Sequence, residues 1–297
     1  ESPTYLGALQ AFSPYEPQYT PIPCDHEGII PEALAPLLAK GRMKFIYLVP
    51  TFQNPSGRTL PLDRRRAIAA LIERYDALLI EDDPYCDLRY EGHALPPIKS
   101  LAPEHVVYVG TLSKVFAPGL RIGFCVAPEP IRNWLVLVKQ GVDLHTSTFN
   151  QALAAAYLEG GHLQRHLPRI LDLYRPRQRA MLAALDRYFP VGFRWSHPEG
   201  GMVVWVEGPE GSDMAEIYHA AVRRQVACVP GPFFVPKAGE GLNTMRLNFT
   251  MPGTVEIDHA IHKLGDVIRE CMDCRPSGQS GGAKGQQNTP CAGIEVF

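Results

Sequence analysis

The sequence predicts an α/β protein with a mostly parallel sheet in a large domain, followed by a smaller α+β domain. Short apolar runs alternate with amphipathic stretches over the first half of the chain, as in a parallel sheet covered by helices on both faces. Polar residues follow three predicted strands, at the strand ends where α/β proteins bind ligands. With 297 residues, 45% of them hydrophobic, the chain is long enough for one large core and one smaller core.

The first predicted strand covers 45–49. Apolar residues spaced at i, i+3, i+4 and i+7 then predict a helix over 62–75 with one buried stripe. Further predicted strands are 78–80, 106–109 and 122–127. Two helices follow, with apolar stripes at Ile131, Trp134, Leu135 and Val138 and at Phe149, Leu153 and Ala156. These elements form the large domain, which ends at about residue 160.

A helical stretch over 161–188 connects this domain to the next, and Pro168 and Pro176 should interrupt it because each lacks a backbone donor. The second domain covers 189–270. It comprises a turn at Gly200-Gly201, strands at 202–206, 226–229 and 245–249, and helices near 213–224 and 254–270. Over 271–297 Gly, Ser, Gln and Pro replace apolar periodicity, which predicts a disordered tail.

Charge and cysteine content narrow the partners and the compartment. A net charge of −2 and a pI near 6.6 give no general attraction to nucleic acid or to an anionic membrane, so we expect small-molecule partners. No apolar run has transmembrane length. The seven cysteines are scattered and odd in number, and the first residues lack a signal-peptide pattern. We therefore expect a reducing, cytoplasmic location.

The segment from Thr111 to Arg121 carries the strongest chemical signal. Lys114 stands between hydroxyl residues and a guanidinium, directly after the strand 106–109. A cation beside the amine favours its neutral, nucleophilic form. Thr111, Ser113 and Arg121 can hold a phosphate, which leaves Lys114 free to form a Schiff base. We interpret Lys114 as a lysine that binds pyridoxal phosphate.

Two other strand ends carry groups that suit a charged heteroaromatic ring. Asn54 follows the strand 45–49, and Asp82 and Tyr85 follow the strand 78–80. A pyridine nitrogen needs a carboxylate to stay protonated, and Asp82 is placed for this role. Tyr85 and Asn54 can hydrogen-bond the phenolic oxygen of the ring.

Each of these motifs also has a simpler interpretation. Taken alone, the motifs around Asn54 and Asp82 are ordinary turns, and their order around Lys114 is what favours a site. On spacing alone Tyr5 is equally a packed aromatic residue, and Arg246 alone is an ordinary surface residue of a strand. A structural histidine is the default for His145. Cys271 and Cys274 lack a second ligand pair, so we assign them no metal or redox role.

From Tyr5 to about residue 270, the order and spacing of these motifs resemble the fold-type-I pyridoxal-phosphate aminotransferases of class I/II. The segments 47–57 and 141–146 are most similar to the branch of 2-aminoadipate and kynurenine aminotransferases, which includes the aminotransferase-like domains of MocR-type regulators. The resemblance implies the fold type I architecture. It implies an enzyme that moves an amino group from an L-amino acid, aromatic or 2-aminoadipate-like, to a 2-oxo acid.

The resemblance also implies a role for each site residue. Lys114 forms the Schiff base and moves the proton during catalysis, and Asp82 pairs with the pyridine nitrogen. Tyr85 and Asn54 hold the phenolic oxygen, and Asn54 and Arg246 contact the substrate, with Arg246 on its α-carboxylate. The remaining cofactor contacts are Thr111, Ser113 and Arg121 at the phosphate and Tyr5 stacked on the ring. The Asn54-Pro55 bond is expected to be cis, as in similar family turns.

The sequence departs from this family at its start, where the glycine-containing phosphate loop and the N-terminal arm are absent, and we expect weak or absent activity from it. The family usually forms homodimers, which we expect here if the N-terminal part is present. Two alternatives share the same residues: an effector-sensing domain of a MocR-type regulator, which would need an upstream DNA-binding segment, and a lyase on the same scaffold. The amino donor stays open.

Overall fold

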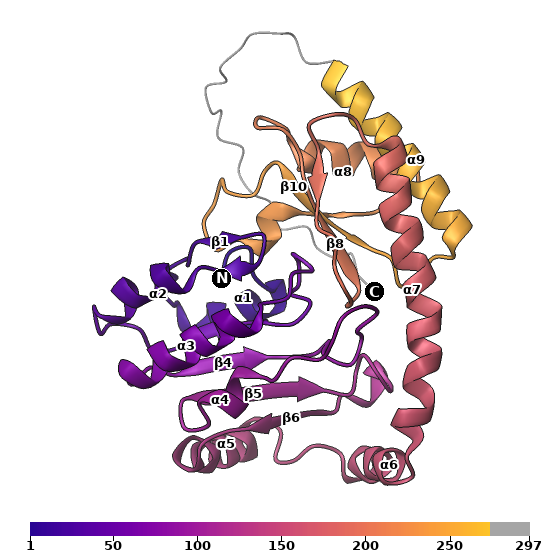
Figure 1. Cartoon of the computed structure of the whole chain (residues 1–297). Helices are drawn as coiled ribbons and strands as arrows, with labels where there is room; N and C mark the ends of the chain where they lie inside the picture. The colour runs from indigo at the N-terminus through magenta and orange to yellow at the C-terminus, as the bar shows by residue number, and fades with distance from the viewer. Residues whose placement is uncertain (274–297) are drawn as a thin grey trace.

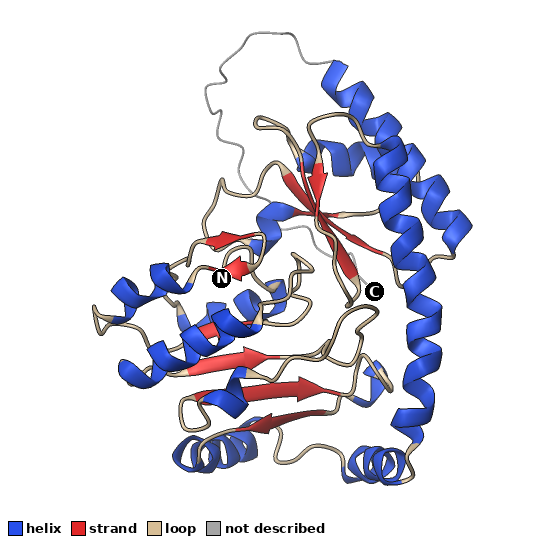
Figure 2. Cartoon of the chain, in the orientation of Figure 1, coloured by secondary structure: helices blue, strands red, loops and turns tan. Residues whose placement is uncertain are grey.

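The computed structural model describes residues 1–273 and contains two α/β units joined by one long helix (Figure 1). The larger unit holds a sheet with the strand order β3-β4-β5-β6, and the smaller unit holds a sheet with the order β7-β8-β10-β9. Figure 2 shows these two sheets apart from each other, with helices around both. A third, two-stranded sheet pairs β1 (Cys24–Asp25) with β2 (Gly28–Ile29). The predicted α/β class is confirmed.

The large sheet is mostly parallel. β3 (Ile46–Leu48), β4 (Leu79–Asp82) and β5 (Val106–Thr111) run in the same direction, and β6 (Gly123–Val126) pairs antiparallel with β5. Because the carboxyl ends of the three parallel strands meet at one edge, the residues that follow them are brought together there.

Three helices cover one face of this sheet: α2 (Pro31–Leu38), α3 (Leu62–Arg74) and α4 (Ile98–Leu101). The predicted stripe of α3 is confirmed, since Ile68 and Ile72 are fully buried in the core that these helices share with β3, β4 and β5. Asp63 in the first turn of α3 and Arg74 in its last turn complement the helix dipole.

A fully buried arginine, Arg65 of α3, ties the segment after β3 to this core. Its guanidinium donates to the carbonyl oxygens of Pro50, Leu60 and Pro96 at 2.8–3.1 Å and to the hydroxyl of Thr51 at 2.9 Å. Backbone carbonyls of a buried loop need donors, and one side chain supplies several of them here. Arg65 therefore holds the start of the loop that carries Asn54.

The opposite edge of the large unit leaves much apolar surface in solvent. α5 (Glu129–Val142) buries no residue, and in α6 (Thr148–Glu159) only Ala154 is buried. Trp134 is 70% exposed and Phe149 is 74% exposed, so the predicted apolar stripes do not face a core of this chain. The edge strand β6 is likewise exposed along its whole length.

The small unit packs a four-stranded antiparallel sheet against three helices. Its strands are β7 (Arg194–Trp195), β8 (Val203–Glu207), β9 (Val229–Pro230) and β10 (Thr244–Asn248). Its helices are α7 (His162–Tyr188), α8 (Met214–Arg223) and α9 (Thr254–Asp273), which share one buried core with the sheet. The short elements of the chain are α1 (Leu6–Phe12), η1 (Ser13–Tyr15), η2 (Pro118–Leu120) and η3 (Gly231–Phe234).

A short backbone pairing connects the two units. The segment 88–91 lies antiparallel to 199–201, with the Tyr90 amide donating to the Glu199 carbonyl and the Gly201 amide donating to the Leu88 carbonyl, both at 2.8 Å. Only glycine fits at Gly200, because a Cβ atom there would lie 2.3 Å from the Leu88 carbonyl oxygen and from the Phe52 ring. The Gly200-Gly201 turn therefore serves as a contact between the units.

The structure also differs from the sequence-based expectations in α7 and at the end of α9. α7 continues through Pro168 and Pro176 as one helix, so the predicted interruption is wrong; packing of α7 against α9 and the small sheet outweighs the lost backbone donors. α9 extends to Asp273, three residues past the predicted end of the domain at 270, so the predicted tail does not start at 271. The rest of that tail lies outside the described residues.

Replacing Arg65 with Met should lower the free energy of unfolding by about 3 kcal/mol, because buried carbonyl oxygens lose their donors. Urea denaturation followed by circular dichroism would measure the change. Met at the neighbouring exposed position Arg66 is the matched control and should change stability little. Equal losses in the two variants would contradict the role given to Arg65.

Candidate active site

The predicted site residues gather at the carboxyl edge of the large sheet, where the small unit approaches it (Figure 1). Asn54 follows β3, Asp82 ends β4 and Lys114 follows β5. Arg246 of β10 reaches the same place, since its side chain bonds to Asn54. The sheet edge and the small unit thus both contribute side chains.

A hydrogen-bonded chain links Arg246, Asn54 and Tyr85. Arg246 Nη1 donates to Asn54 Oδ1 at 3.0 Å, and Asn54 Nδ2 donates to the Tyr85 hydroxyl at 3.4 Å. The turn between Asn54 and Pro55 has the expected cis peptide bond. Burial raises the pKa of Tyr85 to about 12, so its hydroxyl stays protonated at neutral pH and can donate a hydrogen bond.

The Arg246 guanidinium has capacity left for an anion. It lies 5.1 Å from the centre of the Phe234 ring, and its buried Nε has no hydrogen-bond partner among residues 1–273. Burial lowers the pKa of Arg246, which reflects a partly desolvated cation without a carboxylate beside it. A carboxylate ligand is the partner that this geometry suits.

Strand alternation gives the adjacent acids Glu81 and Asp82 different environments. Glu81 points into the core, where its carboxylate accepts the backbone amides of Ile98 and Lys99 at 2.8 and 2.7 Å. Burial raises its pKa to about 7. Asp82 points to the opposite face, toward the site. Glu81 is therefore an anchor for the start of α4, whereas Asp82 belongs to the site.

Asp82 has one hydrogen-bonded neighbour. The hydroxyl of Tyr47 donates to Asp82 Oδ2 at 2.5 Å. Burial raises the pKa of Asp82, and the bond from Tyr47 acts in the opposite direction. Tyr47 was not selected from the sequence; the available signal was its position in the strand 45–49, where a phenol alternates with the buried Ile46 and Leu48.

Thr111 and Ser113 place two hydroxyl groups side by side at the end of β5. The Thr111 hydroxyl lies 2.9 Å from the Ser113 hydroxyl and also accepts the Ser113 amide at 3.1 Å. Both side chains are half-buried. Adjacent hydroxyls of this kind can donate to the oxygens of one phosphate group.

Lys114 carries an amine with no partner among the described residues, although it is half-buried. Burial lowers the pKa of Lys114, and the nearby charges of Arg121 and Arg246 lower it further. A neutral amine is the nucleophilic form of lysine.

Arg121 adopts an unusual backbone conformation next to this amine. Its φ is 54°, in the left-handed region, where non-glycine residues are uncommon. The side chain is exposed, and Nη1 donates to the Pro118 carbonyl at 3.1 Å. The remaining guanidinium donors are free to meet an anion beside Ser113 and Lys114.

Tyr5 precedes α1, and its side chain is 37% exposed. It lies close enough to Tyr85 and Arg246 for its charge to affect their pKa values. The phenol packs against its own helix, because a Cβ atom at Gly7 would lie 2.6 Å from the Tyr5 ring. A partly exposed aromatic ring therefore lies at the edge of the site, which suits stacking on a flat ligand.

The donor set fits pyridoxal phosphate. Lys114 supplies an amine that is unpaired among the described residues, Thr111, Ser113 and Arg121 suit a phosphate, and Asp82 suits a protonated ring nitrogen.

No cluster of metal-ligating side chains occurs within residues 1–273. The same part of the chain contains no helix that is both long and apolar enough to cross a membrane.

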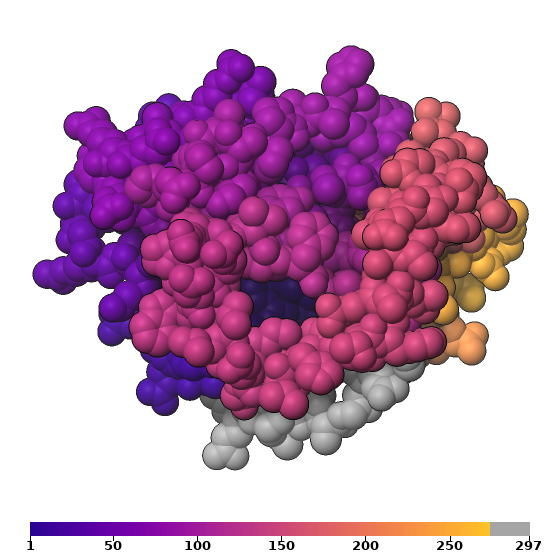
Figure 3. Space-filling model, turned by 90° about the horizontal axis from the view of Figure 1, so that it is seen from below, coloured from indigo at the N-terminus to yellow at the C-terminus, as the bar shows by residue number. Residues whose placement is uncertain are grey.

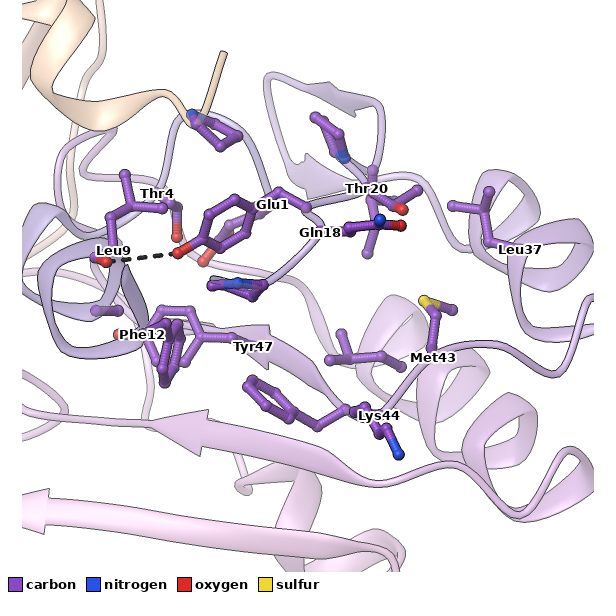
Figure 4. A pocket seen from close by; sticks show the side chains of 18 of the residues that line it. Glu1, Thr4, Leu9, Phe12, Gln18, Thr20, Leu37, Met43, Lys44 and Tyr47 are labelled. Atoms are coloured by element: carbon purple, nitrogen blue, oxygen red, sulfur yellow. Dashed lines mark hydrogen bonds between the residues drawn. The ribbon is translucent and has the colours of Figure 1, made fainter. Parts of the chain in front are cut away.

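A cavity of about 570 Å³ lies beside this site but does not contain it (Figure 4). Its walls come from the first residues of the chain, the segment 17–22 and the segment 42–47. Tyr47 is the one residue of the cavity that bonds to Asp82, and none of the predicted site residues lines it. We therefore place the site at the strand ends and not in this cavity.

The surface has an opening on the side of α5 and α6 (Figure 3). Seen from that side, the molecule has an opening ringed by residues of the second quarter to the middle of the chain, with N-terminal residues at its floor (Figure 3). The N-terminal segment carries Tyr5.

Comparison with known proteins identifies the family. Residues 2–264 match the family model described as aminotransferase class I and II. The chain belongs to the class I and II aminotransferase family. The architecture described above is that of the fold type I aminotransferases.

Two curated members of this aminotransferase family are similar over most of the chain. The aromatic-amino-acid aminotransferase 1 of Thermococcus litoralis is 45% identical over 92% of this chain and 66% of its own length. The 2-aminoadipate transaminase of Thermus thermophilus is 39% identical over 91% of this chain and 68% of its own length. The chain thus spans about two thirds of the length of these relatives.

A solved aminotransferase structure shows the same fold. The alpha-aminoadipate aminotransferase of Thermus thermophilus, in complex with N-(5'-phosphopyridoxyl)-L-leucine, superposes with a TM-score of 0.86 at 38% identity. The match covers 91% of this chain and 70% of that structure.

Replacing Lys114 with Met should stabilise the cofactor-free chain at pH 7, with a gain that shrinks as the pH approaches 10. The lowered pKa of Lys114 means that the unfolded chain binds more protons between the folded and the ordinary pKa, so stability rises with pH in that window. Below the folded pKa the whole penalty is present, and Met removes it. Urea denaturation at pH 7 and 10, with Met at the exposed Lys263 as control, measures the effect; a gain that is the same at both pH values would refute it.

Proposed function

We propose that this chain is a pyridoxal-phosphate-dependent aminotransferase that moves an amino group from an L-amino acid to a 2-oxo acid. The observation that supports this proposal is the unpaired, half-buried Lys114 amine with its lowered pKa, between phosphate-binding groups and the Arg246 guanidinium. A reaction of this kind needs a neutral amine, an anion site for a phosphate and a second anion site for a substrate carboxylate.

The residues of the site have distinct proposed tasks. When bound, pyridoxal phosphate supplies an aldehyde that takes up amino groups and a ring that accepts the electrons released at the substrate Cα. Thr111, Ser113 and Arg121 hold its phosphate, Tyr85 and Asn54 hold its phenolic oxygen, and Asp82 faces its ring nitrogen. Tyr5 covers the ring from the N-terminal side.

Lys114 and Arg246 act on the substrate. Arg246 binds the α-carboxylate through its free donors, and its bond to Asn54 holds the guanidinium in place. This fixes the Cα–H bond relative to Lys114 Nζ. With the cofactor bound, the neutral amine of Lys114 would take the proton from the substrate Cα and hold it at Nζ for return.

For the amino donor we propose an aromatic or a 2-aminoadipate-like amino acid. The support is the named activity of the relatives, one an aromatic-amino-acid aminotransferase and one a 2-aminoadipate transaminase. The lyase alternative would use the same residues, and product analysis separates the two: a new amino acid formed from the 2-oxo acid indicates transfer, whereas ammonia or an eliminated fragment indicates a lyase.

We further propose a cytoplasmic homodimer. The support for association is the apolar surface of α5 and β6, where Trp134 and Phe124 are 70% and 49% exposed. Contiguous exposed apolar surface of this kind marks sites where proteins associate. Sedimentation velocity of the purified chain would report its oligomeric state.

Titrating the chain with pyridoxal phosphate should produce a long-wavelength absorption band that is lost in Lys114→Ala and that bleaches when 2-aminoadipate or an aromatic amino acid is added. The Lys114 amine is the group that would bind the cofactor covalently, so its loss removes the band. Ala at the exposed Lys263 serves as the control and should retain it. A band of equal strength in the Lys114 variant would rule the assignment out.

Replacing Arg246 with Lys should raise the KM for the amino acid about a hundredfold, with a smaller effect on kcat, because an ammonium cannot bind a carboxylate bidentately. Steady-state kinetics at varied amino-acid concentration would show this split. Lys at the exposed Arg223 is the control. An unchanged KM would place the carboxylate site elsewhere.

A further inference from the structure

Tyr47 and Asp82 form a hydrogen-bonded pair at this site. Asp82 has a part in the proposed function, whereas Tyr47 has none so far. Tyr47 lies on β3 opposite Ile80 of β4, and Asp82 lies two residues further along β4 on the same face. The hydroxyl therefore reaches the carboxylate diagonally across neighbouring strands, at 2.5 Å. The ladder between β3 and β4 fixes both backbones, so the contact is built into the sheet.

The aromatic ring of Tyr47 is held in place from the N-terminal side. Phe12 at the end of α1 packs edge-to-face on it, with ring centres 5.7 Å apart, and also packs on Phe45 at 5.2 Å. Figure 4 shows Phe12 directly beside Tyr47 at the wall of the cavity. A ring clamped in this way has few orientations open to it, so its hydroxyl remains directed at Asp82.

The Asp82 carboxylate receives no second hydrogen bond within residues 1–273. Tyr47 thus occupies Oδ2, while no donor from the described part of the chain reaches Oδ1. Glu1, Tyr5 and Tyr85 are the other titratable groups close to this pair. Glu1 accepts the Val49 amide at 2.7 Å and does not bond to Asp82. Among the residues that the structure describes, the tyrosine hydroxyl is therefore the one donor that stabilises a charge on Asp82.

We propose, building on the proposed function, that Tyr47 is a positioning residue that keeps Asp82 ionised and leaves Oδ1 as the acceptor for the protonated ring nitrogen of pyridoxal phosphate. A buried carboxylic acid and a pyridine compete for a single proton, and a donor to the carboxylate stabilises its charged form. With the Tyr47 hydroxyl present the proton stays on the ring nitrogen. Without it the proton moves toward Asp82, and the ring accepts electrons less well.

The test is Tyr47→Phe, loaded with pyridoxal phosphate labelled with ¹⁵N at the ring nitrogen and measured by NMR. The resonance should move from the pyridinium position toward that of neutral pyridine, and kcat should fall about tenfold or more while KM changes little. Tyr108→Phe is the matched control, because Tyr108 donates to the adjacent Asp83 at 3.1 Å without reaching Asp82. It should leave the ¹⁵N resonance in place.

The outcomes separate this inference from the proposed function. A cofactor-loaded Tyr47→Phe protein with an unchanged ¹⁵N resonance overturns the inference alone, whereas a wild-type chain that forms no Lys114-dependent band overturns both. If Tyr47→Phe does not fold, 3-fluorotyrosine installed at position 47 keeps the shape of the ring with a stronger donor. The pH at which the ring nitrogen loses its proton, followed by the ¹⁵N resonance, should then rise, and an unchanged value counts against the inference.

A double-mutant cycle of Tyr47 and Asp82, measured by the cofactor dissociation constant, tests the inference independently. In an Asp82→Asn background, removing the Tyr47 hydroxyl should change the cofactor dissociation constant less than twofold, since no carboxylate is left to stabilise. In the wild-type background the same change should weaken binding about tenfold. Equal effects in both backgrounds would make Tyr47 a packing residue and contradict the inference.

Discussion

The antiparallel pairing of residues 88–91 with 199–201 determines where the small unit stands on the large one. It is short, but it is reinforced by the Arg89–Glu199 ion pair at 2.7 Å and by the Arg89 guanidinium lying 4.7 Å from the centre of the Phe52 ring. Phe52 lies two residues before Asn54, and β8 starts two residues after Gly201. The same contact therefore sets the distance between the loop that carries Asn54 and the sheet that carries Arg246.

Strand geometry determines which side chains of the large sheet face the core and which face the candidate site. In β4 alternate side chains serve opposite faces, so Glu81 anchors α4 through two backbone amides while Asp82 faces the site. Parallel strands bring Asn54, Asp82 and Lys114 to one edge although they come from separate parts of the chain. Arg65 then supplies donors to the carbonyls of the first of these loops, which allows polar backbone to run through a buried region.

Local patterns predicted most of this arrangement, because they depend on neighbouring residues. The alternating strands and helices and the stripe of α3 follow from periodicity, and the strand-end motifs indicated Lys114, Asp82 and Asn54 as neighbours, with their roles still predictions. Tyr47 was missed because its importance depends on register with β4, which periodicity does not specify. The continuity of α7 was missed because packing against α9 outweighs the local effect of its prolines.

The two prolines of α7 give this helix uneven bending stiffness. Proline has no amide hydrogen, so the carbonyls of Gln164 and Asp172 lose their helical donors and the helix is softest near Pro168 and Pro176. About 18 Å of helix lie beyond Pro176, at 1.5 Å per residue, so a bend of about 5° there displaces the far end by roughly 1.5 Å. The pairing of residues 88–91 with 199–201 joins the two units beside this helix and opposes such a bend, so the position of the small unit depends on that pairing as well as on the helix.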